Sequence, residues 1–372
     1  MTSRPTRSSG KARRVLMTLD SVGGVWRYAM DLAASLKQFD TQVVFVGLGP
    51  TPSAEQQREA EGRGKLVWLD ASLDWMVEDE GALTHVPDLL GDLADHEQVD
   101  LLHLNLPSQA AGLRCAEPVL VVSHSCVVSW FDVVRGQDVP PEWRWQKRLN
   151  RQGLRRADVV VAPSRSHADL LNSVYRGIKP VDVVHNGSGA PADASNKEDF
   201  VIAAGRWWDD GKNGAVLDAA AAMTDWPVVM AGATEGPNGQ HLDLKHGIGR
   251  GALSHEATMR LMQRAAIAVS PSLYEPFGLV PLEAAHQGAA LVLADIPTYR
   301  ELWDGAALFA DPRDPAALSA QINLLARHPE ERRDYAQRAL LRSRLFTLSA
   351  QAKAMNDKYD GLLGRSRSLS AA

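Results

Sequence analysis

Two glutamates, Glu275 and Glu283, are separated by seven residues in the segment PSLYEPFGLVPLEAAHQG, which runs from Pro271 to Gly288. Carboxylates accept hydrogen bonds from hydroxyl groups, so a pair held at a fixed spacing can bind a hydroxyl-rich ligand. The alternative is that both are solvated side chains near a helix start, where the helix macrodipole favours negative charge. The residues around the pair favour the binding site.

The chain around this pair is suited to a turn from a strand into a helix. Residues 266–270 are apolar and predict a short buried strand, Pro276 and Gly278 interrupt the chain, and Pro281 suits the first turn of a helix. The first backbone N–H groups of a helix have no partner inside it, and a diphosphate or a sugar hydroxyl can accept from them. Here they belong to Phe277, Gly278 and Leu279. The segment therefore predicts a sugar-nucleotide site.

Two cations, Arg206 and Lys212, flank a loop that follows the apolar run FVIAA. A phosphate-binding P-loop needs four residues between its glycines and Ser or Thr after its lysine. Five residues separate Gly205 from Gly211, and Asn213 follows the lysine, so the loop is not of that kind. Arginine offers a fork for two phosphate oxygens and lysine a compact point charge, which suits a diphosphate. The alternative is a pair of surface cations.

The first half of the chain contributes five candidates at predicted strand ends. Gly23 and Gly24 lie between a strand and a helix, where glycine lets backbone N–H groups approach an anion, although a tight turn needs glycine as well. His124 follows the apolar run VLVVS, and His103 and Asn105 end the preceding strand. Open parallel sheets bind ligands at the carboxyl ends of their strands. For His124, the alternative is a hydrogen-bonded loop histidine.

The pattern YEPFGLVPLEA resembles the signature of the retaining glycosyltransferases of family 4 (glycosyl transferases group 1), which have the two-domain GT-B fold. The resemblance implies that Glu275 binds hydroxyls of the donor sugar and that Glu283 holds the ribose of the nucleotide. The family also has an Arg and a Lys directed at the donor diphosphate, and Arg206 and Lys212 match them. One departure is His286 in AAHQG, where the family usually has a small residue, often Cys, before the glycine.

The same resemblance implies roles for the first half of the chain. Family members with a glycine pair at the first turn set it beside the donor phosphates and the acceptor, as expected for Gly23 and Gly24. A histidine at the place of His124 often reaches the donor sugar near the reacting carbon. His103 and Asn105, on the same rim, are candidates for acceptor contact.

Composition excludes several classes of protein. With 372 residues, 45% hydrophobic and 23% charged, the chain suits two globular domains with a core in each. A formal charge of -5 gives no reason to expect nucleic acid as a partner. The two cysteines, Cys115 and Cys126, have no metal-ligand spacing and indicate a reducing compartment.

No apolar run reaches the roughly 18 to 20 residues that a membrane-spanning helix needs. Residues 2–14 carry five cations and no acid, but Asp20 breaks the apolar run after them and no cleavage site follows, so no signal peptide is predicted. We expect a cytoplasmic protein with a solvated basic tail. Weak contact of that tail with an anionic membrane face is the alternative.

Apolar runs rich in β-formers alternate with helix-period stretches, which predicts parallel sheets covered by helices. Expected strands in the first half are 15–19, 43–46, 65–69, 100–104, 119–123, 158–162 and 181–184. In the second half they are 200–204, 228–231, 266–270, 290–294 and 307–309. The small and polar stretch 187–199 is the predicted linker.

These elements predict an α/β protein with two parallel sheets, and the family resemblance implies the GT-B class, in which two Rossmann-like domains face each other across a cleft. The expected boundaries are an acceptor-side domain over 1–190, a domain that binds the nucleotide sugar over 191–345, and a C-terminal helix with a short tail over 346–372. Helices are expected at 317–327, 329–343 and 349–363. As the family resemblance implies, the last helix crosses back to the first domain, with a contact expected through Met355, Tyr359 and Leu362.

Two further stretches have residues that could bind a membrane or a metal ion. The basic and aromatic stretch between Trp130 and Arg156 is expected to be a helix that covers the sheet, with a membrane or an acidic acceptor as the alternative partner. HEATM begins like a zinc motif at His255, but Met259 stands where HExxH needs its second histidine, and no Asp-x-Asp occurs. We expect a metal-independent enzyme without a cofactor.

Together these features predict a retaining glycosyltransferase that moves a hexose from a UDP- or GDP-linked donor to an acceptor hydroxyl. The acceptor would be a glycan, a glycolipid or a polysaccharide precursor. Arg206, Lys212 and the helix N–H groups would stabilise the leaving diphosphate, and the sequence shows no dedicated base. One alternative is a sugar-nucleotide epimerase of the same fold, whose acid and base carboxylates we cannot place. Another is a non-catalytic nucleotide-sugar-binding partner in polysaccharide assembly.

Overall fold

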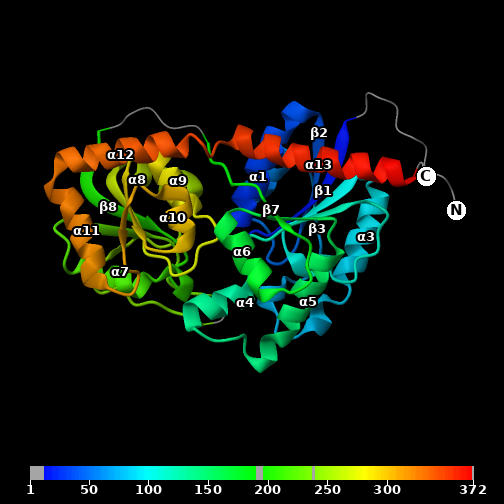
Figure 1. Cartoon of the computed structure of the whole chain (residues 1–372), viewed down its shortest axis with the longest axis horizontal. Helices are drawn as coiled ribbons and strands as arrows, with labels where there is room; N and C mark the ends of the chain where they lie inside the picture. The colour runs from blue at the N-terminus through cyan, green and yellow to red at the C-terminus, as the bar shows by residue number, and fades with distance from the viewer. Residues whose placement is uncertain (1–11, 190–195, 237–238, 371–372) are drawn as a thin grey trace.

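The computed structural model describes residues 12–189, 196–236 and 239–370. They form two α/β domains that lie side by side, each built on one parallel sheet with helices on both faces (Figure 1). The predicted fold class is confirmed. Most of the basic tail and part of the predicted linker lie outside the described residues. Arg13 and Arg14, however, belong to the first strand and pair with Asp360 and Glu97, so these two cations are not part of a solvated tail.

The first domain contains a seven-stranded sheet in the order β3-β2-β1-β4-β5-β6-β7. Its strands are β1 (Arg13–Leu19), β2 (Thr41–Gly47), β3 (Lys65–Trp68), β4 (Leu101–Leu104), β5 (Val119–Val122), β6 (Val159–Ala162) and β7 (Val181–Val183). Its helices are α1 (Gly24–Leu36), α2 (Ala54–Glu61), α3 (Val86–His96), α4 (Val127–Trp130), α5 (Arg144–Arg156) and α6 (Arg165–Val174). The central strands are almost wholly apolar because helices cover both faces of the sheet. All seven expected strands are present.

The second domain contains a six-stranded sheet in the order β10-β9-β8-β11-β12-β13. Its strands are β8 (Glu198–Ala204), β9 (Val228–Ala231), β10 (Ile248–Gly249), β11 (Ala265–Ser270), β12 (Ala290–Ala294) and β13 (Leu308–Ala310). Its helices are α7 (Gly214–Ala221), α8 (His255–Arg264), α9 (Leu279–His286), α10 (Pro297–Trp303), α11 (Pro315–Arg327) and α12 (Pro329–Ser343). The five expected strands are confirmed. The short edge strand β10 was not expected, because its two exposed residues carry no apolar pattern.

The last helix, α13 (Leu348–Ser370), leaves the second domain and runs across the first (Figure 1). Met355, Tyr359 and Leu362 are buried in the same apolar cluster as residues of α1 and β1. At about 25 cal/mol per Å² of apolar surface, burying three such side chains stabilises the contact by several kcal/mol. The predicted crossing back of the last helix is therefore confirmed.

The two domains also meet around the segment that carries the glutamate pair. The hydroxyl of Tyr274 accepts a hydrogen bond from the backbone N–H of Cys126 at 3.0 Å. Ser164 donates to the carbonyl of Pro276 at 2.6 Å. The carboxylate of Glu301, on α10, accepts from the first backbone N–H groups of α6 at 2.7 and 2.8 Å. Residues of the first domain therefore hold the loop before α9 in place.

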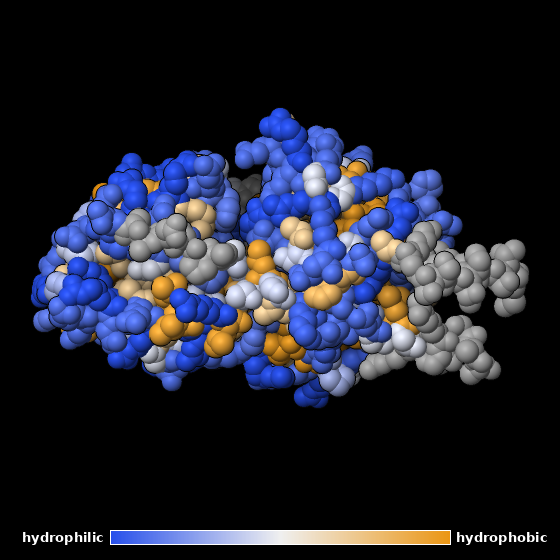
Figure 2. Space-filling model, turned by 90° about the horizontal axis from the view of Figure 1, so that it is seen from above, coloured by the Kyte–Doolittle hydropathy of each residue, from blue (hydrophilic) through white to orange (hydrophobic). Residues whose placement is uncertain are grey.

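The face of the molecule seen from above is mostly polar (Figure 2). Hydrophilic residues dominate both domains in the view from above, with hydrophobic residues in small patches (Figure 2). The large exposed apolar side chains are scattered over both domains: Met76, Met223, Ile248, Leu253, Leu341 and Leu345. Over the described residues, no helix combines the length and the apolar character that crossing a membrane requires.

Candidate functional site

Two helices, one from each domain, begin at the same place between the domains. Gly278 precedes α9 with φ at 90°, and Gly23 precedes α1 with φ at 110°, and residues with a Cβ rarely adopt either conformation. A Cβ at Gly24 would lie 4.0 Å from Cδ1 of Leu279, the first residue of α9. The positive ends of two helix dipoles therefore converge, which favours an anion between them.

Cations stand beside these helix starts. A Cβ at Gly23 would lie 3.8 Å from Nη1 of Arg206, so the predicted glycine pair and the predicted arginine face each other across the domains. Arg206 is partly exposed and its guanidinium lies over the ring of Trp208. Trp207 is buried and donates its indole N–H to the carbonyl of Ala231. Trp207 is therefore a packing residue.

Lys212 and Glu275 form an ion pair in which Nζ lies 2.6 Å from Oε2. Lys212 ends a short 3-10 helix after β8, and Glu275 lies in the loop before α9. Both side chains are more than three-quarters buried. The pair holds the lysine close to the start of α9 and leaves the second carboxylate oxygen without a partner in the pair. A ligand with both phosphate and hydroxyl groups could bind to both side chains.

Glu283 lies in the second turn of α9 and is almost completely buried. Burial raises the pKa of its carboxyl to about 8, with a further increase from the charge of Asp31 and an opposing effect of Arg27. Nδ1 of His255, on α8, lies 4.0 Å from Oε1 of Glu283, and burial lowers the pKa of that histidine. Because a protonated carboxyl both donates and accepts, Glu283 suits the two hydroxyls of a ribose.

His124 lies after β5 and is held by one hydrogen bond. Its Nε2 lies 2.8 Å from Oδ1 of Asn105, and the amide nitrogen of Asn105 donates to the carbonyl of Thr18 at 2.6 Å. This orientation of the amide requires Nε2 of His124 to carry the proton, so Nδ1 is the acceptor nitrogen. Burial lowers the pKa of His124 to about 3. The ring of Tyr28 packs edge-on against the imidazole at 4.4 Å between centroids.

His103 and Asn105 were expected to contact the acceptor, and the structure gives them a different position. His103 has no exposed surface, and its ring nitrogens lie 2.6 Å from the hydroxyl of Tyr359 and 3.2 Å from Oδ1 of Asn105. Asn105 is 2% exposed. Neither side chain can reach a ligand in this conformation. The hydroxyl of Tyr359, on α13, covers His103. Because Oδ1 of Asn105 bonds both His103 and His124, the two residues support His124.

Two residues near the site, Tyr28 and Asp20, were not predicted from the sequence. Tyr28, on α1, has no motif of its own. Asp20 comes directly after the apolar strand β1, at the carboxyl end where such sheets bind ligands, and that signal could have identified it. Burial raises the pKa of Asp20 to about 6, against the hydrogen bond from Val22 and the charge of Arg206. Asp20 thus lies within electrostatic reach of the predicted diphosphate site.

The remaining candidates lie away from these groups. His286 faces α12 and donates to the carbonyl of Ser343 at 3.2 Å, so this departure from the family pattern does not line the site. The stretch 130–156 includes α5, as predicted, and Trp145 at its start is buried against the core. Across residues 12–189, 196–236 and 239–370, no group of three or more His, Cys, Asp or Glu could hold a metal ion.

Family models match both halves of the chain. The model described as Glycosyltransferase Family 4 matches residues 22–188, and the model described as Glycosyl transferases group 1 matches residues 193–342. The two matches adjoin within the region predicted as the linker and together include every site residue that was predicted from the sequence.

Curated relatives match parts of the chain. Glycogen synthase of Mycobacterium tuberculosis is 40% identical over 97 residues, which are 25% of this chain and 23% of the relative. The lipopolysaccharide core biosynthesis mannosyltransferase LpsB of Rhizobium meliloti is 26% identical over 265 residues, 59% of this chain and 69% of the relative. The chain thus spans about a quarter of the length of the glycogen synthase and about two-thirds of LpsB.

Solved structures share the fold over almost the whole chain. A sucrose-phosphate synthase from Thermosynechococcus elongatus superimposes with a TM-score of 0.78 at 18% identity, over 95% of this chain and 100% of that one. Anabaena Alr3699/HepE in complex with UDP-glucose gives a TM-score of 0.72 at 17% identity, over 94% and 99% of the two chains. At these identities the likeness concerns the fold alone.

Proposed function

Because the chain belongs to the family 4 glycosyltransferases with the GT-B fold, we propose that it transfers a hexose from a nucleoside diphosphate sugar to an acceptor hydroxyl, with retention at the anomeric carbon. One observation carries the proposal: the N-termini of α1 and α9 converge from the two domains beside Arg206 and the Lys212–Glu275 pair. Two helix dipoles and two cations around one space suit a diphosphate. UDP and GDP are the proposed carriers.

In the proposed reaction, the bond between the anomeric carbon and the diphosphate oxygen breaks while the acceptor oxygen bonds to the same carbon. Negative charge grows on the leaving diphosphate, and Arg206, Lys212 and the N–H groups at the start of α9 stabilise it. The leaving oxygen takes the proton of the acceptor hydroxyl, which balances the step without a separate base. Glu275 orients the sugar and Glu283 holds the ribose.

A histidine at this place could bind a hydroxyl of the donor sugar or neutralise the diphosphate. The neutral state of His124 favours the first role. With its proton fixed on Nε2 by Asn105, His124 offers Nδ1 as an acceptor for a hydroxyl of the donor sugar. A pKa of about 3 keeps the imidazole uncharged at every pH at which the fold would be assayed. His124 is therefore proposed to fix the sugar rather than to neutralise the diphosphate.

Donor hydrolysis tests the proposal even before the acceptor is identified, because water can replace the acceptor slowly. The protein is incubated with α-linked UDP- and GDP-hexoses in EDTA, and the released sugar is followed by NMR. We expect the α-anomer first, at a rate that chelation does not change. Release of the β-anomer, or loss of activity in EDTA that Mg²⁺ restores, would contradict retention or metal independence.

The same assay separates the two alternatives. An epimerase converts the donor without an acceptor and without net transfer, and its product is an epimeric hexose. A non-catalytic binding partner binds the nucleotide sugar and releases nothing. Because a carboxylate and two cations lie beside two converging helix starts, a transferase is the function that the geometry supports best.

A further inference from the structure

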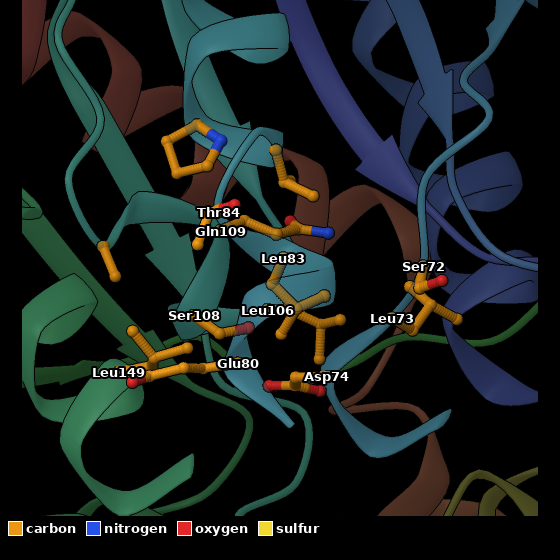
Figure 3. A pocket seen from close by; sticks show the side chains of 13 residues that line it. Ser72, Leu73, Asp74, Glu80, Leu83, Thr84, Leu106, Ser108, Gln109 and Leu149 are labelled. Atoms are coloured by element: carbon orange, nitrogen blue, oxygen red, sulfur yellow. The ribbon is translucent and has the colours of Figure 1, made fainter. Parts of the chain in front are cut away.

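A cavity of about 220 Å³ opens in the first domain, at the carboxyl end of its sheet. Its walls come from the segments after β3 and β4, from the start of α3 and from α5. Figure 3 shows Leu83 and Leu106 in the middle of the view, with Gln109 and Thr84 above them and Asp74 below, and all five side chains line the cavity. None of these residues belongs to the donor site.

Hydrogen bonds connect the wall of this cavity to His124. Gln109, in the wall, accepts from the hydroxyl of Thr18 at 2.7 Å, and the same hydroxyl accepts from the backbone N–H of Asn105 at 2.8 Å. Asn105 in turn holds His124. A molecule in the cavity would therefore lie next to the groups that position the donor sugar.

The charge interactions of Asp20 also relate the cavity to the diphosphate site. The carboxyl of Asp20 responds to the charges of both Arg206 and Asp74. Asp74 lines the cavity and Arg206 faces Gly23 at the donor site. Asp20 is thus close enough to both for their charges to act on its carboxyl.

The lining indicates the chemistry of such a ligand. Most of the wall is aliphatic: Leu73, Leu83, Val86, Pro87, Leu106, Ala111 and Leu149. The lining residues, all in the described part of the chain, include the acids Asp74 and Glu80 and no Lys, Arg or His. Glu80 is paired with Arg148, whereas Asp74 is buried and bonded to Ser108 and Asn150. An anionic group would meet no cation here, so an uncharged group is favoured.

Size narrows the choice further. An apolar protein cavity of about 150 Å³ holds a benzene ring, so this cavity has room for a six-membered ring with a substituent. An oxygen substituent could bond to Asp74 or Ser108 while the ring contacts the leucines.

We propose that this cavity binds an uncharged six-membered ring of the acceptor, with one oxygen substituent directed at Asp74 and Ser108. The inference rests on the proposed function in one respect: it identifies the bound ring as a part of the acceptor. It implies that the preferred acceptor has an apolar, uncharged portion next to its reacting hydroxyl.

Ligand-observed NMR on the full chain tests the proposal with phenol, cyclohexanol and phenyl phosphate as probes. Two variants block the cavity: Ala111→Phe fills it, and Thr84→Phe covers its mouth from an exposed position that tolerates a larger side chain. Ala82→Phe is the matched control, since Ala82 is exposed on the neighbouring 3-10 helix and does not line the cavity. Circular dichroism identifies variants that do not fold, and UDP and GDP are titrated in parallel.

We expect phenol and cyclohexanol to bind the wild type and Ala82→Phe equally, and to bind at least tenfold more weakly to each folded cavity variant. Phenyl phosphate should bind more weakly than phenol to the wild type. Equal binding by wild type and cavity variants, preference for the phosphate or no binding of the neutral probes would overturn the proposal. The nucleotide titrations keep the two questions apart: ring binding without nucleotide binding would contradict the proposed function and leave the cavity assignment intact.

Discussion

The two halves of the site differ in charge and in burial. In the second domain, Arg206, Lys212 and Glu275 are charged and reach partly into solvent. In the first domain, half-buried His124 and buried Asn105 and His103 form an uncharged chain of hydrogen bonds.

The two halves therefore have different roles in the proposed reaction. A diphosphate that gains negative charge needs cations and dipoles already directed at it, which the second domain supplies. A sugar ring with neutral hydroxyls needs fixed acceptors, and a neutral histidine held through Asn105 is one. Substitutions in the two halves should therefore alter different quantities, and the following variants test that expectation from the largest effect to the smallest.

Lys212→Ala should have the largest effect. It removes a cation from the diphosphate and leaves Glu275 without its ion-pair partner. We expect turnover to fall by about 10²- to 10³-fold, the scale for the loss of one strong transition-state donor. Lys353→Ala, at an exposed ion pair on α13, is the control and should leave turnover unchanged. A folded Lys212→Ala enzyme with wild-type turnover would remove the lysine from the mechanism.

Glu283→Gln should change how stability depends on pH. Because the pKa of Glu283 is about 8 in the fold and about 4.5 in the unfolded chain, the fold holds this proton more tightly. The wild type should lose stability as the pH rises from about 5 to 8, by up to about 1.4 kcal/mol per pH unit from this group. Glu283→Gln should lack that contribution. Urea unfolding at pH 5, 6.5 and 8 measures it, and parallel curves for both proteins would contradict the raised pKa.

Asn105→Ala should act on turnover alone. It frees His124 to adopt the other tautomer without touching the cations of the second domain. We expect turnover to fall about tenfold, equivalent to about 1.4 kcal/mol, with the affinity for nucleoside diphosphate unchanged. A loss of nucleotide affinity equal to the loss of turnover would show that the two halves are not separate in this sense.

Glu301→Gln should have the smallest effect, on domain closure. Although burial opposes ionisation, hydrogen bonds from His185, Ser166 and Arg165 lower the pKa of Glu301 to about 2, so the carboxylate is charged at neutral pH. The amide would weaken the bonds to the start of α6 by about 1 kcal/mol. Small-angle scattering should detect a slightly larger radius of gyration for the variant. An unchanged radius together with unchanged stability would mean that this contact does not hold the domains.

Much of the fold followed from local pattern. The strands are apolar runs because both faces of each parallel sheet are covered, and such runs are visible in a single sequence. β10 was missed because two exposed residues at an edge carry no such run. The placement of Glu275 and Glu283 was predictable for a related reason: a strand, a turn and a helix position both within one segment.

The first-domain half of the site was harder to predict because its environment is formed by distant residues. His103 is covered by Tyr359, which lies 256 residues further along the chain. No local pattern near His103 indicates that its ring is buried and out of reach of a ligand. The cavity near Asp74 has the same origin, since its walls come from loops, 3-10 helices and two α-helices that only the folded chain brings together.

Calorimetry with UDP and GDP and their nucleosides tests the central claim most directly. If two helix starts and two cations form a diphosphate site, one of the nucleoside diphosphates should bind at least 100-fold more tightly than its nucleoside. Arg206→Ala should then weaken binding of the diphosphate and leave binding of the nucleoside unchanged. Equal affinities for diphosphate and nucleoside, or equal weakening of both by the substitution, would contradict the account.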